Sequence, residues 1–232
     1  MMSTYRNPSD AFARYILGLG SYPAQIALNT PAGSLTLTAY SYDDILTVNE
    51  IFCRLDYPGN NDDRVIVDFG SNIGLSAAFF LSRNPDCFAY LYEPLPANVG
   101  RLRQNLHCFH GRYTLEEVAV GHTDGLVEFG WEPTGRYGGV GVRTGRYLSV
   151  ACRDSNQILA EAIARHGMVD VLKIDIEGLE KDVTQRIPVH VARKIRRIYV
   201  EHDFGSNPLE QTHSYRQYGA VAQFTNHEMT SR

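Results

Sequence analysis

Hydrophobic residues recur along this chain in short runs that alternate with segments of helical periodicity. The runs are rich in Val, Ile, Leu and Tyr and predict buried strands at 65–67, 87–92, 113–120, 169–174 and 195–200. Between them, apolar residues three or four positions apart predict helices at 72–83, 96–107, 154–165 and 178–186. This alternation favours an α/β fold, a doubly wound, mostly parallel Rossmann-like sheet with helices on both faces.

The first 60 residues carry a different pattern and are expected to form a short N-terminal extension. Helical spacing at 11–17 and 43–55 flanks an alternating strand at 34–39, and a polar stretch separates this part from the rest of the chain. We therefore divide the chain into an extension, residues 1–60, and a main domain, residues 61–232. The pattern alone suits a cover over a ligand crevice and an independent appendage equally well.

A glycine loop follows the first buried run of the main domain. The strand runs into Asp68, and Gly70 and Gly74 then lead into the next predicted helix. Without a Cβ, Gly70 can adopt backbone angles denied to other residues and lets a ligand approach the main chain. Gly74 would let the helix, with its free N–H groups, pack closely on the strand. This strand–loop–helix pattern predicts a cofactor site.

An acidic residue on the next strand helps to identify the cofactor. Glu93 lies about 20 residues beyond Gly74, the spacing at which a carboxylate can hold both hydroxyls of a ribose. An NAD-linked oxidoreductase has the same spacing, but Asn72 stands where NAD needs bare backbone against its pyrophosphate. S-adenosylmethionine (SAM) has no pyrophosphate, and Asp68 can meet its ammonium group, directly or through water, while loop N–H groups meet its carboxylate. The residues therefore favour SAM over NAD.

Three sequence blocks, at 65–76, 91–96 and 169–178, carry a family resemblance. In their order and spacing they resemble the FkbM family of SAM-dependent methyltransferases, and the similarity extends over about 35–202. The resemblance implies that SAM is the cofactor, that S-adenosylhomocysteine is its product, and that the extension covers the cofactor crevice. It also implies contacts with the methionine part from Gly70, Ser71, Asn72 and Gly74, with the ribose from Glu93, and with the adenine from residues near Ala119.

Two residues at predicted strand ends are candidates for the catalytic base. Methyl transfer from a sulfonium is an in-line displacement, and an alcohol acceptor must also lose its proton. Asp175 ends the fourth strand and His202 the fifth, so either can face the acceptor. Their structural alternatives are a histidine satisfied by Asp203 and an aspartate that orients SAM. Carboxylates also gather here with Glu177 and Glu201, but we predict no bound metal.

Two further segments are expected to be irregular or peripheral. The stretch 135–146 is rich in glycine and arginine without periodicity, which predicts a long loop. Arg136, Arg143 and Arg146 could hold an anionic acceptor there, although a solvated loop with scattered charge is the favoured interpretation. Near the C-terminus, 220–224 is predicted to be an antiparallel strand at the edge of the sheet.

Composition narrows the function further. A net charge of −4 gives no electrostatic case for binding nucleic acid or an anionic membrane, and no apolar run could span a bilayer. Residues 1–10 lack a signal-peptide pattern, and four scattered cysteines predict reduced thiols in a cytoplasmic protein. The expected function is SAM-dependent O-methylation of a hydroxyl on a sugar or secondary metabolite, a small-molecule or glycan acceptor. An NAD-linked oxidoreductase and a non-catalytic SAM-binding protein are the alternatives, and N- or C-methylation is left open.

Overall fold

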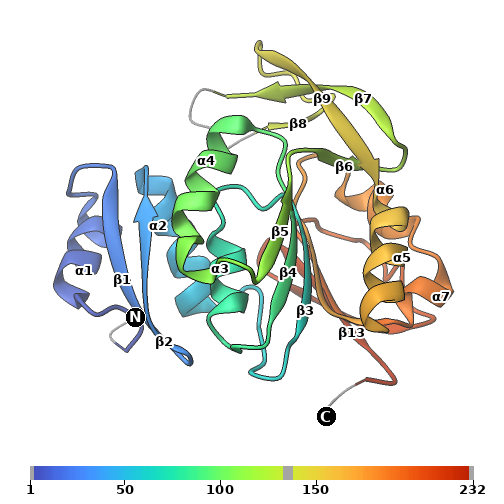
Figure 1. Ribbon diagram of the computed structural model, residues 1–232, viewed down its shortest axis with the longest axis horizontal. Coiled ribbons are helices and arrows are strands. Elements are labelled where there is room, and N and C mark those ends of the chain that lie inside the picture. The colour runs from blue at the N-terminus through green and yellow to red at the C-terminus, as the bar shows by residue number, and fades with distance from the viewer. Residues whose placement is uncertain (1–2, 133–137, 230–232) are drawn as a thin grey trace.

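A seven-stranded sheet forms the centre of the computed structural model, which describes residues 3–132 and 138–229 (Figure 1). The strand order is β12-β13-β11-β10-β3-β4-β5, and the five strands from β11 to β5 are parallel. Their bounds are β3 Val65–Phe69, β4 Phe88–Tyr92, β5 Tyr113–Glu116, β10 Val169–Ile174, β11 Ile195–Val200, β12 His213–Tyr218 and β13 Val221–Asn226. The doubly wound, mostly parallel fold class is thus confirmed.

Helices cover both faces of this sheet (Figure 1). One face carries α3 (Leu75–Leu81) and α4 (Pro96–Asn105), which is followed by a 3-10 turn, η2 (His107–Phe109). The other carries α5 (Ser155–His166), α6 (Glu180–Gln185) and α7 (Val189–Ala192). Because strand residues alternate between faces, Ile66 and Val171 join the core beneath α3, whereas Val67 and Leu172 join the core beneath α5.

The chain reverses its direction of travel across the sheet between β3 and β10. From β3 it moves outward to β4 and β5, and it later returns to β10 and β11 on the other side. Ligands in such sheets bind beyond the carboxyl ends of the strands at this switch point. The register pairs Lys173 of β10 with Asp68 of β3, close to those ends.

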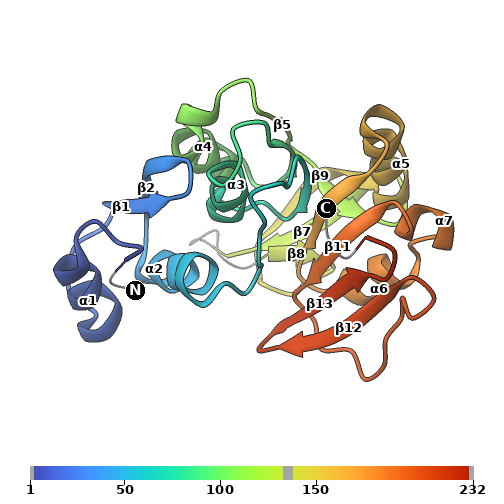
Figure 2. The same cartoon turned by 90° about the horizontal axis from the view of Figure 1, so that it is seen from below.

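The N-terminal extension packs beside α3 and α4 (Figures 1 and 2). It contains α1 (Pro8–Leu17), a hairpin of β1 (Ala24–Thr30) and β2 (Gly33–Ala39), and α2 (Tyr42–Asn49), which continues as a π-helical turn, η1 (Glu50–Arg54). The Asn105 side chain of α4 accepts a hydrogen bond from the Thr38 N–H at 2.7 Å and so tethers the hairpin to the main domain. The strand at 34–39 is confirmed, but β1 was not predicted, although its burial alternates as a strand requires.

A second, four-stranded sheet lies above the carboxyl ends of the main strands (Figure 1). Its order is β6-β9-β7-β8, with β6 Ala119–Gly121, β7 Gly125–Trp131, β8 Gly138–Val140 and β9 Tyr147–Asp154. The single strand predicted at 113–120 is wrong because the chain leaves the main sheet after Glu116 and pairs with β9 instead. The loop predicted at 135–146 is wrong at 138–140, where β8 pairs with β7, and Arg136 lies outside the described residues.

The C-terminal hairpin differs from the single edge strand predicted at 220–224. Figure 2 shows β12 and β13 side by side at one edge, where β13 pairs with both β11 and β12. The outermost strand is therefore β12. Its sequence, His-Ser-Tyr-Arg-Gln-Tyr, lacks apolar alternation because an edge strand is held mainly by backbone pairing.

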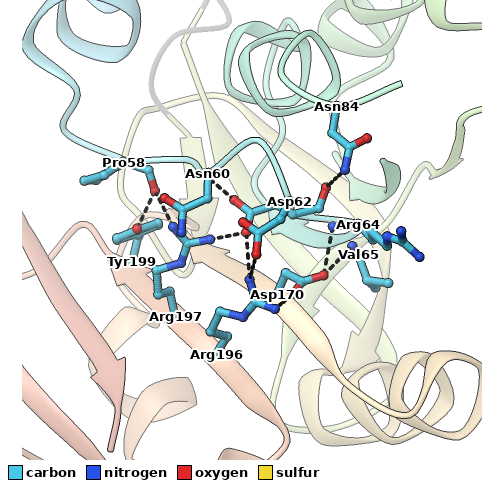
Figure 3. A network of polar contacts seen from close by, with 11 residues as sticks. Pro58, Asn60, Asp62, Arg64, Val65, Asn84, Asp170, Arg196, Arg197 and Tyr199 are labelled. Atoms are coloured by element: carbon cyan, nitrogen blue, oxygen red, sulfur yellow. Dashed lines mark hydrogen bonds and ion pairs between the residues drawn. The ribbon is translucent and has the colours of Figure 1, made fainter. Parts of the chain in front are cut away.

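A polar network joins the linker at 58–63 to the amino ends of β3, β10 and β11 (Figure 3). The buried Arg197 guanidinium bonds the Asp63 carboxylate and, at 3.2 Å, the Pro58 carbonyl. Arg196 bonds Asp170 at 2.9 Å, and the Asp170 carboxylate accepts the Arg64 N–H at 2.8 Å. These contacts fix where the extension enters the main domain.

Replacing Asp63 by alanine is expected to lower the free energy of unfolding by about 3–5 kcal/mol, because it leaves the Arg197 charge buried and unpaired. Asp62 is the matched control, since its side chain is 46% exposed although it also pairs with Arg196. Asp62→Ala should cost less than about 1 kcal/mol. Urea unfolding followed by circular dichroism measures both, and equal losses would show that burial of the pair does not matter.

Candidate active site

A cavity of about 480 Å³ opens at the carboxyl ends of the central strands. The loop after β3, the end of β4 and the end of β10 form its floor, and β6 and β7 of the small sheet contribute a wall. The π-helical turn η1 and the turn between β12 and β13 close the opposite side through residues such as Glu50, Ile51 and Val221. The extension therefore supplies part of the cavity wall.

The glycine loop is tightly fitted beneath this cavity. Gly70 has φ of +80°, and a Cβ there would lie 1.7 Å from the Asp175 carbonyl oxygen. Gly74 has φ of +85° and faces Leu102 of α4, which a Cβ would crowd at 3.0 Å. The Ser71 hydroxyl donates to the Asp68 carbonyl at 2.9 Å. The loop is thus held by its own backbone before any ligand binds.

Glu93, at the end of β4, faces both the loop and the cavity. Its carboxylate accepts the Asn72 N–H at 2.9 Å and the Leu95 N–H at 3.0 Å. Burial raises the pKa of Glu93 to about 7, although hydrogen bonds from Leu95 and Asn72 oppose the rise. Ser71, Asn72 and Glu93 all line the cavity, so the structure brings these candidates together.

Asp68 lies beneath the cavity rather than on its surface. It is fully buried, and its carboxylate accepts the Ser76 hydroxyl at 2.6 Å and the Lys173 ammonium at 3.2 Å. Ser76 and Lys173 line the cavity, whereas Asp68 does not. Any influence of Asp68 on a ligand must therefore pass through these two partners.

Lys173 connects the two sides of the site, and the sequence analysis assigned it no role. Its ammonium donates to the Gly70 carbonyl at 3.1 Å and pairs with Asp175 at 3.0 Å, in addition to Asp68. Burial favours the neutral amine, but the two carboxylates outweigh it and raise the pKa of Lys173. The aromatic ring of Tyr57, from the linker, lies 5.7 Å from the ammonium. The buried lysine is thus a fixed positive charge.

The two candidate bases occupy different surroundings. Asp175 follows β10 and lines the cavity, with 26% of its side chain exposed. His202 follows β11, but its ring packs edge-on against Phe204 at 4.8 Å between centroids, and it is not among the residues that line the cavity. The neighbour of Asp175 across the strand ends is instead a second carboxyl group, that of Glu201, to which it is hydrogen-bonded. The sequence analysis placed Glu201 only in an acidic cluster.

Apolar side chains gather at the end of the cavity beneath the small sheet. Ala119 of β6, Leu95 and Phe129 of β7 pack in one buried cluster and also line the cavity. The Leu95 N–H donates to the Glu93 carboxylate, so this cluster adjoins the residue predicted to hold the ribose. The sequence placed Ala119 at the predicted adenine end by resemblance alone.

The described residues contain neither a metal-binding cluster nor a membrane-spanning helix. Within residues 3–132 and 138–229, no group of three or more His, Cys, Asp or Glu side chains is placed to hold a metal ion. Over the same ranges, no helix is long and apolar enough to cross a membrane.

The strand order, with its switch between β3 and β10 and its antiparallel β13 inserted beside β11, defines a doubly wound, mostly parallel Rossmann-like fold. The model of the methyltransferase FkbM domain matches residues 68–225, which is more than half of the 232 residues. The chain therefore belongs to the FkbM methyltransferase family.

Two curated relatives and one solved structure illustrate the similarity. The AMB antimetabolite synthetase AmbE of Pseudomonas aeruginosa is 27% identical over 212 residues, covering 73% of this chain and 10% of that protein. The 2-O-methyltransferase NoeI of Sinorhizobium fredii is 27% identical over 139 residues, covering 52% of this chain and 56% of NoeI. This chain thus spans about half of NoeI and a tenth of AmbE. An O-methyltransferase family protein from Burkholderia thailandensis is 12% identical, with a TM-score of 0.42, covering 80% of this chain and 56% of that one.

Proposed function

We propose that this protein transfers a methyl group from SAM to a hydroxyl of a sugar or secondary-metabolite acceptor. One observation carries the proposal: a single cavity is lined both by Glu93, the carboxylate proposed for the ribose, and by Asp175, the carboxylate proposed for the acceptor. The similarity to a protein named a 2-O-methyltransferase supports oxygen as the target atom. The similarity to an antimetabolite synthetase supports a secondary metabolite as an acceptor.

The residues at the donor end fit SAM in their chemistry. Gly70, Ser71, Asn72 and Gly74 would hold the methionine part, and Glu93 the ribose. The apolar cluster around Ala119 suits an adenine ring. Asp68 would act on the ammonium through the Ser76 hydroxyl, which lines the cavity and donates to the Asp68 carboxylate. When bound, SAM supplies an activated methyl group on a sulfonium.

At the acceptor end, the protein has to orient a hydroxyl and receive its proton. Asp175 is the proposed hydrogen-bond acceptor for that hydroxyl, because of the two predicted bases it is the one that lines the cavity. Residues 1–60 act in this proposal as a cover, since Thr47, Glu50 and Ile51 help to close the cavity. The acceptor itself is a small molecule or a glycan.

Glu93→Gln tests the donor site directly. We expect it to weaken SAM binding about 10- to 100-fold, because a charged hydrogen-bond acceptor for the ribose becomes a neutral amide. Glu132→Gln, at the rim of the same cavity, is the matched control and should leave the affinity within about twofold. Isothermal titration calorimetry measures both, with circular dichroism to verify folding. Unchanged binding in Glu93→Gln would place the ribose elsewhere.

The identity of the acceptor is tested by incubating the protein with a panel of sugars and hydroxylated metabolites. The methyl donor is SAM with a deuterated methyl group. Mass spectrometry should detect a deuteromethyl group on an oxygen, and Asp175→Asn should slow its formation about 100-fold or more. A label found on nitrogen or carbon would overturn O-methylation while leaving the SAM site intact. Binding of NAD in place of SAM would overturn the donor assignment.

A further inference from the structure

Two acidic side chains meet at the acceptor end of the cavity. Asp175 follows β10 and Glu201 follows β11, and their carboxyl groups are hydrogen-bonded to each other. A hydrogen bond between two carboxyl groups requires a proton on one of them. Both residues line the cavity, and Glu201 is exposed to it. Ile174 and Val200, which immediately precede these two residues, are partners in the sheet, so the two carboxyl groups can share a single proton between the strand ends.

The ion pair with Lys173 decides which of the two holds the proton. Burial opposes ionisation of Asp175, but Lys173 and the hydrogen bond from Glu201 outweigh it and lower the pKa of Asp175. The Asp175 charge, followed by burial, raises the pKa of Glu201 to about 9. Without ligand at neutral pH, Asp175 is therefore ionised and Glu201 carries the shared proton.

Other charged groups surround this pair from each packed element. Lys173 of β10 lowers the proton affinity of Glu201, whereas Glu177, in the loop after Asp175, raises it. From the linker, Tyr57 faces both carboxyl groups; its own pKa is raised well above the usual value, so it stays neutral. The hairpin between β12 and β13 contributes only Ala220 and Val221 to the cavity here, and neither is charged.

The cavity as a whole favours a positively charged ligand. Among the described residues that line it, seven are acidic and two are basic: Glu50, Asp56, Glu93, Glu132, Asp175, Glu177 and Glu201 against Arg54 and Lys173. A cation inside the cavity stabilises ionised carboxylates and so lowers their proton affinity. SAM and its product differ in this respect, because the sulfonium is cationic and the thioether is neutral.

We propose that the Asp175–Glu201 pair holds one shared proton. The pair releases this proton when the cationic donor binds, and it takes up the proton of the acceptor hydroxyl during methyl transfer. This inference rests on the proposed function, and it adds Glu201 to the residues that carry out the reaction. The protonation state of the pair then depends on the charge on sulfur. It is doubly ionised beside a sulfonium and singly protonated beside a thioether.

The proposed methyl transfer conserves atoms and charge. The carbon–sulfur bond breaks with its electron pair remaining on sulfur, and the acceptor oxygen forms the new carbon–oxygen bond. The hydroxyl proton passes to the doubly ionised pair and restores the hydrogen bond between Asp175 and Glu201. One positive charge leaves sulfur and one proton joins the pair, so the net charge of the site is the same before and after transfer.

Proton release on binding is the measurable consequence, and it needs no acceptor. Isothermal titration calorimetry at pH 8 in phosphate and in Tris, which differ in ionisation enthalpy, counts the protons exchanged. We expect about one more proton to be released with SAM than with S-adenosylhomocysteine. Glu93, whose pKa is raised to about 7, is already mostly ionised at pH 8 and therefore contributes little to the protons released.

The pH dependence of affinity has a definite sign. Below pH 9 the free enzyme holds the proton that SAM binding must expel, so SAM affinity should rise with pH, by up to about tenfold per unit. The rise should stop above about pH 9, where the free pair is already fully ionised. The ratio of the two affinities, SAM over S-adenosylhomocysteine, should show this rise without the part due to Glu93.

Two variants separate this inference from the proposed function. Glu201→Gln keeps a hydrogen-bond donor beside Asp175 but has no proton to lose, so it should abolish the extra proton release. Glu132→Gln removes another cavity carboxylate and should keep it. Equal proton counts for SAM and S-adenosylhomocysteine, or extra release that survives in Glu201→Gln, would overturn the inference while SAM binding stands. Failure of the wild-type protein to bind SAM would instead overturn the proposed function.

Discussion

Gly70→Ala is expected to destabilise the protein by about 4 kcal/mol or more and to abolish measurable SAM binding. The new methyl group would lie 1.7 Å from the Asp175 carbonyl oxygen, far inside van der Waals contact. The backbone at φ of +80° is also unfavourable for alanine. Because both obstacles are backbone, relief requires the ends of β3 and β10 to move apart. That movement would displace Asp175 and the loop together.

Gly100 provides a matched control for this substitution. It lies within α4, and a Cβ there would meet nothing within 4 Å. Gly100→Ala should therefore stabilise the protein by about 0.5–1 kcal/mol, since alanine favours a helix over glycine. Urea unfolding measures both changes, and calorimetry with SAM measures the site. A Gly70→Ala protein with wild-type stability and SAM affinity would show that the strand ends are not tightly packed.

Lys173→Met should lower the free energy of unfolding by about 3–5 kcal/mol, because it removes the cation between two carboxylates. Asp68 is fully buried and would lose its ion pair, and Asp175 would lose its closest positive charge. SAM binding should weaken as well, since Lys173 also holds the Gly70 carbonyl at 3.1 Å.

Two further variants test whether the unpaired charge causes the loss of stability in Lys173→Met. Lys181→Met removes an exposed lysine of α6 and should change stability by less than about 0.5 kcal/mol. Adding Asp68→Asn to Lys173→Met removes the unpaired charge and should recover part of the lost stability. Thermal and urea unfolding measure this series. A double variant that is no more stable than Lys173→Met alone would show that packing, and not charge, accounts for the loss.

Local sequence was sufficient to locate the glycine loop and the carboxylate that line the cavity. The apolar run, the acid and the two glycines at 65–76 predict strand, loop and helix because each depends on near neighbours in the chain. Glu93 followed from its spacing, and the structure places it against Asn72, as a loop-facing carboxylate requires. The need for glycine at position 70 was predicted for ligand access, whereas the structure shows a contact with the Asp175 backbone.

Segments that lack their own pattern were predicted less well. The edge strand β12 alternates no apolar residues, and the break between β5 and β6 is caused by pairing with β9, about 30 residues later. The pattern of the extension suited a cover and an appendage equally well, and it gave no sign that the π-helical turn lines the cavity. In each case the deciding partner is distant in the chain.

The sequence by itself determined the fold class, the family and the glycine loop, because periodicity, glycine positions and ordered motifs are properties of local segments. Only the tertiary structure decided the charge arrangement at the acceptor end. Lys173 meets Asp68 across 105 positions of chain, and Glu201 meets Asp175 from a neighbouring strand. It also turned His202 toward Phe204 rather than into the cavity. The proton affinity of a group depends on which charged groups lie beside it. The order of the strands in the sheet determines which charged groups become neighbours.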